Sequence, residues 1–342
     1  MTIKDLARIA GVSHSTVSRS LNNSPLISEK TKTKIKKLAE KHHFDLNASA
    51  RSLSTRKTDT IGVVLPAHYE DRGYLQYLGA LMNSIRYSLE KSSFDAIITF
   101  PKNAISGEDN IRKLVKRRKV DGLLLVIPDI EQDVVDFCLD RSVPLVILHF
   151  KQDKIDTSGV DYIYTDHETG GYMATSHLIA GNRKRIITLT EDRKLFEYGE
   201  RTSGYRRALI GNSLPVNQEW IIEGKCSVDF GYSFTKENAD LFRNIDAVFA
   251  QSDFIAVGVI EALKELKISV PDSIAVIGYD DLDIGTYFKP NLSTVHQPKE
   301  NFAALACERL IDKICMCADE PSVHMVIEPQ LIIRDSCGRK HG

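Results

Sequence analysis

The chain has few of the residues that build covalent or metal-held frameworks. It contains six cysteines in 342 residues, and only Cys315 and Cys317 lie close together. That spacing fits neither a common zinc site nor a disulfide framework, so we interpret the cysteines as reduced, apolar side chains. The motifs GxxxxGK(S/T), GxSxG and HExxH are absent as well, which leaves no phosphate loop, serine nucleophile or metal site to assign. We expect no cofactor and no enzymatic activity.

Apolar runs long enough to cross a membrane are also missing. The longest, such as 122–127 and 143–148, are far shorter than the roughly 20 residues that span a bilayer. The amino terminus shows no basic-then-apolar signal pattern. We therefore expect a cytoplasmic protein with no membrane partner. The hydrophobic content of 42% and charged content of 27% are typical of soluble globular proteins, and the length predicts two or three domains.

Residues 3–22, IKDLARIAGVSHSTVSRSLN, predict two short helices joined by a tight turn. Ala7 is small enough for the point where the helices cross, and Gly11 suits the turn between them. Val17 would pack against the first helix and fix the second helix in place. The side chains left on the outer face are Ser13, His14, Ser15, Thr16 and Arg19. A second helix placed in this way enters the major groove of DNA by its amino end, so that these side chains reach bases and phosphates.

Cap residues and charge support this helix-turn-helix head. Thr2 with Asp5 resembles a capping box, Ser13 caps the second helix, and a third helix is expected after Ser28. Residues 1–57 contain 12 Lys and Arg against 4 Asp and Glu, a balance of +8, although the whole chain carries −1. A solvated basic face is the plain interpretation of such a segment. Its combination with a groove-reading motif favours double-stranded DNA as the partner.

The segment after the head predicts a hinge. Residues 44–60 (FDLNASARSLSTRKTDT) form at most one short helix, which Asn47 caps. VSHSTVSRSLNNSPLISEKT, NASARSL and IGVVLP together resemble the lactose/galactose repressor (LacI/GalR) family of bacterial transcription regulators, over the whole chain. In that family paired hinge helices insert a leucine into the minor groove, and Leu53 matches this leucine. The alternative for Leu53 is an ordinary core residue. Leu46 departs from the family, which often has proline there.

From Thr60 onward, apolar runs alternate with amphipathic stretches, and the pattern restarts after about residue 160. This alternation predicts two α/β lobes with parallel sheets, covered by helices on both faces. Ligands in such architectures bind at the carboxyl ends of the strands, in the crevice between lobes. The resemblance implies the same design, an effector domain similar to periplasmic sugar-binding proteins.

The predicted domains are a head at 1–44, a hinge at 45–60 and an effector-binding and dimerisation domain at 61–342. The resemblance divides this last domain into a first lobe, about 61–160 and 291–320, and a second lobe, about 161–290 and 321–336. The chain then crosses between the lobes three times. Several crossings allow rigid-body closure around a ligand.

The resemblance also implies a set of effector-binding residues. Arg201, in ERTSGYRRAL, matches an arginine that grips the effector, and Asp280, in VIGYDD, matches an effector-contacting acid. A guanidinium and a carboxylate suit sugar hydroxyls or an anionic group. The other matched positions are Tyr74, His149, Ser252, Asp253 and Gln297. His149 and Ser252 depart from the commonest family pattern, and Cys226 stands where some members have a stacking aromatic.

Each candidate also has a structural alternative. Asp280 with Asp281 is typical of a turn, and Asp253 is typical of a helix cap before Phe254. For Arg201 the alternative is an ordinary surface charge. A lone His149 is more often a satisfied buried histidine, and a lone Tyr74 is usually a core residue.

These patterns predict a sequence-specific transcription regulator, a repressor, that binds a palindromic operator as a homodimer. By family analogy His14, Ser15 and Arg19 contact bases, while Ser13 and Thr16 contact phosphates. A small carbohydrate effector, a sugar or sugar derivative, would control DNA affinity as inducer or as corepressor. The alternative is a sugar-processing enzyme with an appended DNA-binding head. The tail DSCGRKHG shows no heptad repeat, which favours a dimer over a coiled-coil tetramer.

Overall fold

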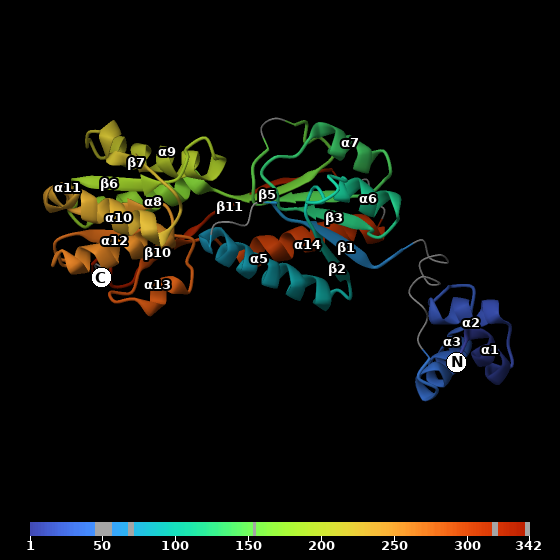
Figure 1. Ribbon diagram of the computed structural model, residues 1–342. Helices are drawn as coiled ribbons and strands as arrows, with labels where there is room; N and C mark the ends of the chain where they lie inside the picture. The colour runs from blue at the N-terminus through green and yellow to red at the C-terminus, as the bar shows by residue number, and fades with distance from the viewer. Residues whose placement is uncertain (45–56, 68–71, 153–154, 317–320, 339–342) are drawn as a thin grey trace.

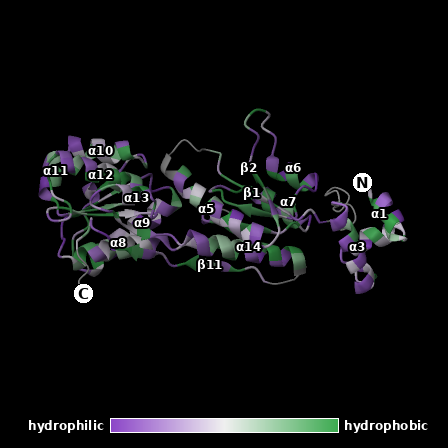
Figure 2. Ribbon diagram, turned by 90° about the horizontal axis from the view of Figure 1, so that it is seen from below, coloured by the Kyte–Doolittle hydropathy of each residue, from purple (hydrophilic) through white to green (hydrophobic). Residues whose placement is uncertain are grey.

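A computed structural model describes residues 1–44, 57–67, 72–152, 155–316 and 321–338. A small helical head lies at one end, followed in line by a first and then a second α/β lobe (Figure 1). Figure 2, a view turned by 90°, shows the head on the same side of the first lobe. Among the described residues, none of the helices combines the length and apolar character needed to cross a bilayer.

The head contains the three predicted helices. They are α1 (Ile3–Ala10), α2 (His14–Leu21) and α3 (Glu29–Lys41). Each is preceded by a hydroxyl side chain that accepts a hydrogen bond from the first turn, and Gly11 ends α1 in the left-handed region at φ 72°. The core beneath consists of Leu6, Ala7, Ala10, Val17, Ile35 and Ala39. So small a core leaves the fold dependent on these caps, each of which contributes about 1 kcal/mol.

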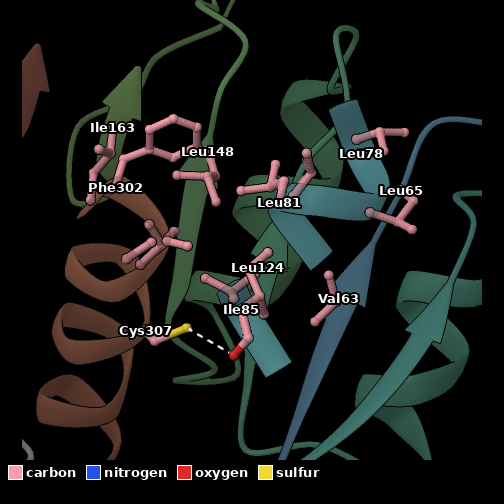
Figure 3. Close-up of a cluster of buried hydrophobic side chains, with 14 of the residues drawn as sticks. Val63, Leu65, Leu78, Leu81, Ile85, Leu124, Leu148, Ile163, Phe302 and Cys307 are labelled. Atoms are coloured by element: carbon pink, nitrogen blue, oxygen red, sulfur yellow. Dashed lines mark hydrogen bonds between the residues drawn. The ribbon is translucent and has the colours of Figure 1, made fainter. Parts of the chain in front are cut away.

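The first lobe is a six-stranded parallel sheet of order β11-β5-β4-β3-β1-β2. Its strands are β1 (Thr60–Val64), β2 (Asp95–Thr99), β3 (Gly122–Leu125), β4 (Leu145–Leu148), β5 (Asp161–Thr165) and β11 (His324–Ile327). Its helices are α5 (Arg72–Lys91), α6 (Asn110–Lys116), α7 (Gln132–Leu139) and α14 (Lys299–Met316). Figure 3 shows one core layer, where Leu81 and Ile85 of α5 and Phe302 of α14 pack with sheet residues such as Leu124. Helices α6 and α7 cover the other face.

The second lobe repeats this design with strand order β12-β10-β9-β8-β6-β7, in which only β12 is antiparallel. Its strands are β6 (Ile186–Thr190), β7 (Ile221–Glu223), β8 (Ala247–Ala250), β9 (Ala275–Tyr279), β10 (Ser293–His296) and β12 (Gln330–Ile332). Its α-helices are α8 (His167–Ala180), α9 (Phe196–Gly211), α10 (Val228–Glu237), α11 (Ala239–Asn244), α12 (Asp253–Glu265) and α13 (Ile284–Tyr287). Because both faces of each sheet are covered, the central strands are almost fully buried, whereas the edge strands β2, β11 and β12 are partly exposed.

Strand pairing corrects the lobe boundaries expected from the sequence. Strands β5 and β11, assigned to the second lobe, pair with each other in the first sheet, whereas β10, assigned to the first lobe, pairs with β9 in the second. The chain therefore crosses between the sheets after β5, after β10 and after β11. Sheet membership depends on which strand edge is available for pairing in space, and the apolar pattern of a strand carries no such information.

A buried ion cluster joins three segments of the first lobe that lie far apart in the sequence. Asp161, at the start of β5, has no solvent exposure. It lies 3.0 Å from Arg309 Nε and 3.1 Å from Lys313 Nζ, both on α14, and it accepts a hydrogen bond from Val323 N. One carboxylate thus joins β5, α14 and the segment that enters β11.

We expect Asp161→Ala to lower the free energy of unfolding by about 3–5 kcal/mol, because it leaves two poorly solvated cations without this carboxylate. Denaturant unfolding followed by circular dichroism measures the change. The control is Glu90→Ala, which removes an exposed ion pair with Arg86 on α5 and should cost less than about 1 kcal/mol. Equal small effects of both substitutions would contradict the structural importance of Asp161.

Candidate functional site

The head presents the predicted DNA-contacting residues at the amino end of α2. Ser13 Oγ accepts a hydrogen bond from Thr16 N at 3.1 Å and lies 2.8 Å from Ser15 Oγ. His14 and Arg19 are exposed, and no other side chain in the described part of the chain pairs with them. The buried Val17 holds the opposite face of α2 against the core. Leu53, the predicted minor-groove residue, lies outside the described residues.

The candidate effector residues lie where strands end. His149 directly follows β4, Asp280 follows β9, and Gln297 follows β10, all at carboxyl ends. His149 adopts φ 80° and Asp280 adopts φ 108°, in the left-handed region that L-residues rarely occupy. Such conformations cost about 1–3 kcal/mol each and cluster at functional sites. Both side chains are buried between the lobes.

A chain of polar contacts connects these residues across the lobes. Tyr77 of α5 places its hydroxyl 3.0 Å from His149 Nδ1 and donates to Gln297 Oε1 at 3.3 Å. Gln297 Nε2 in turn donates to Asp280 Oδ1 at 2.7 Å. Asp280 Oδ1 lies 3.5 Å from a terminal nitrogen of Arg201. Four predicted residues and Tyr77 therefore form one network between the two lobes.

Arg201 is the buried cation of this network. It projects from α9 with only 3% of its surface exposed, and its guanidinium carbon lies 3.8 Å from the centre of the Tyr279 ring. One terminal nitrogen donates to the carbonyl of Gln251 at 2.7 Å. Burial disfavours its charge, but Asp280 and neighbouring groups outweigh burial and raise the pKa of Arg201. The surface-charge alternative for Arg201 is therefore wrong.

Asp280 carries the negative charge of this network and is buried as well. Burial raises the pKa of its carboxyl, while Arg201 and Lys299 oppose this shift. Lys299, the first residue of α14, donates from Nζ to the Asp280 carbonyl at 2.7 Å. Lys299 of the first lobe thus binds the carbonyl oxygen of Asp280, and Arg201 of the second lobe contacts its carboxylate.

Two neutral histidines line the same region. Burial, followed by the charges of Arg201 and Lys299, lowers the pKa of His149 to about 3. Burial and Arg201 also lower the pKa of His167, which begins α8 and lies 6.1 Å from His149 between ring centres. Nδ1 of His167 accepts from Arg201 Nε at 3.5 Å, so its proton belongs on Nε2. In the described structure, that buried Nε2 has no hydrogen-bond partner, which marks a donor available to a ligand.

Asp253 and Ser252 have structural contacts. Asp253 is fully buried, and its carboxylate oxygens accept from Thr294 Oγ1 at 2.6 Å and from Leu282 N at 2.7 Å. Ser252 caps α12, which begins at Asp253, so the cap is the serine and not the aspartate. Ser252 also lowers the pKa of the Asp280 carboxyl, against the dominant effect of burial. Ser252 thus caps a helix beside the network, whereas Asp253 supports the loop after Asp280.

The sequence prediction missed several residues of this site. Tyr77 was not singled out, although Tyr74, one turn earlier on α5, was; the side chain of Tyr74 lies outside the described structure. His167 and Gln251 follow strands β5 and β8 closely. A polar residue directly after an apolar run was the sequence signal that could have identified them. Lys299 showed no such signal, because its contact with Asp280 depends on the crossing after β10. Within the described residues, no group of three or more His, Cys, Asp or Glu side chains is arranged to hold a metal ion.

Comparisons with known proteins agree with this geometry. Residues 2–47 match the model of bacterial regulatory proteins of the lacI family, and residues 175–337 match a periplasmic binding protein-like domain. The chain is 31% identical to the HTH-type transcriptional repressor PurR of Photobacterium profundum and 31% identical to the ribose operon repressor of Haemophilus influenzae, each over 98% of both chains. The chain belongs to the lacI family.

A solved structure of the transcriptional regulator CelR in complex with cellobiose resembles this lacI-family chain. The TM-score is 0.70 at 25% sequence identity, over 98% of this chain and 99% of that chain. The predicted family and fold class are confirmed. This lacI-family protein is a DNA-binding transcription regulator with a ligand-binding type of domain, and the enzyme alternative is set aside.

The buried histidines predict a pH-dependent stability. In the unfolded chain a histidine takes up a proton near pH 6.5, whereas folded His149 resists protonation down to about pH 3. Stability should therefore fall as pH drops below 6.5, and His149 alone should contribute about 1.4 kcal/mol of this loss at pH 5.5. We expect His149→Asn, which tolerates the positive φ, to reduce this loss.

Denaturant unfolding at pH 7.5 and pH 5.5 measures the difference. His14→Asn, on the surface of the head, is the control and should leave the pH dependence of the wild type intact. An unchanged pH dependence in His149→Asn would show that His149 is not held neutral by the fold.

Proposed function

We propose that this lacI-family regulator is a repressor that binds a palindromic operator as a homodimer. We also propose that a small polar ligand, a sugar or sugar derivative, sets its DNA affinity from the crevice between the lobes. The observation that carries this proposal is the buried network of Arg201, Asp280, Gln297 and Tyr77, with the unpartnered His167 Nε2 beside it. The names of the relatives, a repressor of a ribose operon and a regulator bound to cellobiose, support it.

The chemistry of the network suits a ligand with neighbouring hydroxyl groups. Arg201 and His167 offer donors, and Asp280 offers a carboxylate that accepts. A sugar hydroxyl both donates and accepts, so it can replace the direct Arg201–Asp280 contact with two shorter hydrogen bonds. The network joins both lobes, so such a replacement changes how they close.

The hinge segment is attached to the first lobe at Asp121, so movement of this lobe is transmitted to the head. The Asp121 carboxylate accepts from the backbone N–H of Thr58 at 2.8 Å and from that of Asp59 at 2.8 Å. These bonds anchor the end of the hinge segment to the sheet. Coupling between two such sites typically amounts to 1–3 kcal/mol and is reciprocal. An inducer therefore binds more weakly when operator DNA is present, and a corepressor binds more tightly.

An exposed apolar edge of the first lobe supports the dimer. Strand β2 lies at the end of the sheet order and pairs with β1. Ile98 on this strand and Phe100 just beyond it are exposed, and Tyr87 of α5 is 68% exposed. An exposed edge strand with apolar side chains is a pairing hazard unless another chain covers it. We propose that a second copy covers this edge, and that the dimer acts on DNA in the cytoplasm.

In the proposed DNA complex, His14, Ser15 and Arg19 contact bases, and Ser13 and Thr16 contact phosphates. We expect Arg19→Ala to weaken operator binding by about 1–3 kcal/mol and to relax preference at one base pair per half-site. Fluorescence anisotropy with a set of single-base operator variants measures both effects. Arg8→Ala, an exposed arginine of α1, is the control and should leave base preference unchanged. Equal loss of affinity on all sequences would assign Arg19 to phosphates.

The effector proposal is tested by a thermal-shift screen of sugars, sugar phosphates and nucleobases against the full chain. A ligand that binds only the folded protein raises its melting temperature. We expect a sugar to do so, and Arg201→Lys to weaken its binding at least tenfold, because lysine lacks the planar pair of donors. The control is Arg207→Lys on the outer face of the same helix, where Arg207 pairs with Glu168. A shift that persists in Arg201→Lys would place the ligand elsewhere.

A further inference from the structure

A basic groove lies at the amino-terminal edge of the first sheet, opposite the edge that carries the effector network. Its volume is about 1050 Å³, and it lies among the starts of β1, β3 and β4 and the last turns of α6, α7 and α14. The cations that line it are Lys57, Lys116, Arg118, Arg141 and Lys313. Asp121 is the carboxylate among its lining residues, and backbone N–H groups already occupy it.

We propose that this groove is a second DNA-contacting surface, which binds backbone phosphates beside the sequence read by the head. The inference rests on the DNA-binding function proposed above. It assigns a direct role in DNA binding to the effector domain itself.

Three cations of the groove differ from their neighbours in lacking acidic partners. On α6, Arg112 pairs with Asp133 and Lys113 pairs with Glu108. In the described part of the chain, no carboxylate pairs with Lys116, Arg118 or Arg141. Surface cations are ordinarily interspersed with carboxylates, so an unneutralised group at one edge indicates an anionic partner.

Two of these cations are also held in place. Arg141 lies with its guanidinium carbon 3.8 Å from the centre of the Phe137 ring and donates to the Phe137 carbonyl. Lys116 Nζ lies 5.9 Å from the centre of the same ring. Because the ring positions both charges, less side-chain entropy is lost when a phosphate binds.

Stabilisation of helix ends explains some of the cations in this groove but not all of them. The helices α6, α7 and α14 end at this edge, and each helix end carries about half a negative charge that a nearby cation stabilises. Lys116 on α6 fits that explanation, and Lys313 on α14 is already neutralised by Asp161. Lys57 donates from Nζ to the Ile314 carbonyl at 3.2 Å, in the last turn of α14, so it fits as well. Arg118 lies beyond the end of α6. The half charges at three helix ends and the Asp121 carboxylate do not balance the four cations Lys57, Lys116, Arg118 and Arg141, so the groove keeps a positive excess.

The position of the groove favours DNA over a free anion. Lys57 and Thr58 line it, so it lies where the hinge segment joins the first lobe, and Figures 1 and 2 show the head on this side. DNA held by the head is tethered to this face at an effective concentration in about the millimolar range. Individually weak phosphate contacts then add measurably to affinity.

The test compares the salt dependence of operator binding in two matched double variants. The groove variant is Lys116→Gln with Arg118→Asn. The control is Lys264→Gln with Lys267→Asn in the second lobe, where Lys264 lies in the last turn of α12 and Lys267, like Arg118, follows a helix at positive φ. Both variants lose two positive charges in the same local geometry.

We expect the groove variant to bind operator and random DNA more weakly at the same base preference. Its slope of log affinity against log salt should fall by about 0.9 for each phosphate that the variant no longer neutralises. The control should keep the wild-type slope. An unchanged melting temperature and circular-dichroism spectrum show that the groove variant is folded, and Lys116→Gln alone should give a smaller change of slope.

A groove variant with the slope of the control overturns the inference. A melting temperature that inorganic pyrophosphate raises in the wild type but not in the groove variant, at unchanged slope, makes the groove a small-anion site and overturns it as well. Wild-type protein that prefers no palindromic duplex over random DNA refutes the proposed function itself, which is a separate outcome.

Discussion

The polar network between the two lobes depends on the buried contact between Arg201 and Asp280. Removing two charges from water costs several kcal/mol per ion, and a contact of 3.5 Å returns only part of that cost. The carbonyl of Gln251, the amide of Gln297 and the Tyr279 ring offset a further part of the cost. A pair held in this way is only partly satisfied. A ligand is therefore able to replace the direct Arg201–Asp280 contact. Gln297 connects this pair to Tyr77, so the replacement also changes contacts of the first lobe.

Backbone packing sets the geometry of this pair. Helices α8 and α9 touch where glycines face each other: a Cβ at Gly171 would lie 2.1 Å from the Arg201 carbonyl, and one at Gly204 would lie 2.0 Å from that of Glu168. No other residue permits such an approach. The close contact brings Arg201 on α9 beside His167 at the start of α8, and Asp280, at positive φ, places its carboxylate near Arg201.

In the proposed mechanism, the first lobe connects the network around Arg201 and Asp280 to DNA. Its carboxyl edge holds Tyr77 and His149 in the effector network, and its amino edge anchors the hinge segment through Asp121. A parallel sheet between covering helices is stiff, so movement at one edge is transmitted to the other. The basic groove beside Asp121 extends this connection, because a reoriented lobe also changes which phosphates the groove reaches.

The sequence alone determined the elements whose formation depends on near neighbours. The helix-turn-helix follows from Thr2, Ser13 and Gly11, and the alternation of buried strands and helices predicted two α/β lobes with polar residues at strand ends. Only the tertiary structure decided that β5, β10 and β11 change lobes, that Tyr77 and His167 join the site, and that Asp253 turns toward Thr294. Caps and periodicity act within a few residues of the chain, whereas strand pairing and the contacts of a cleft join residues far apart in sequence, which no local pattern records.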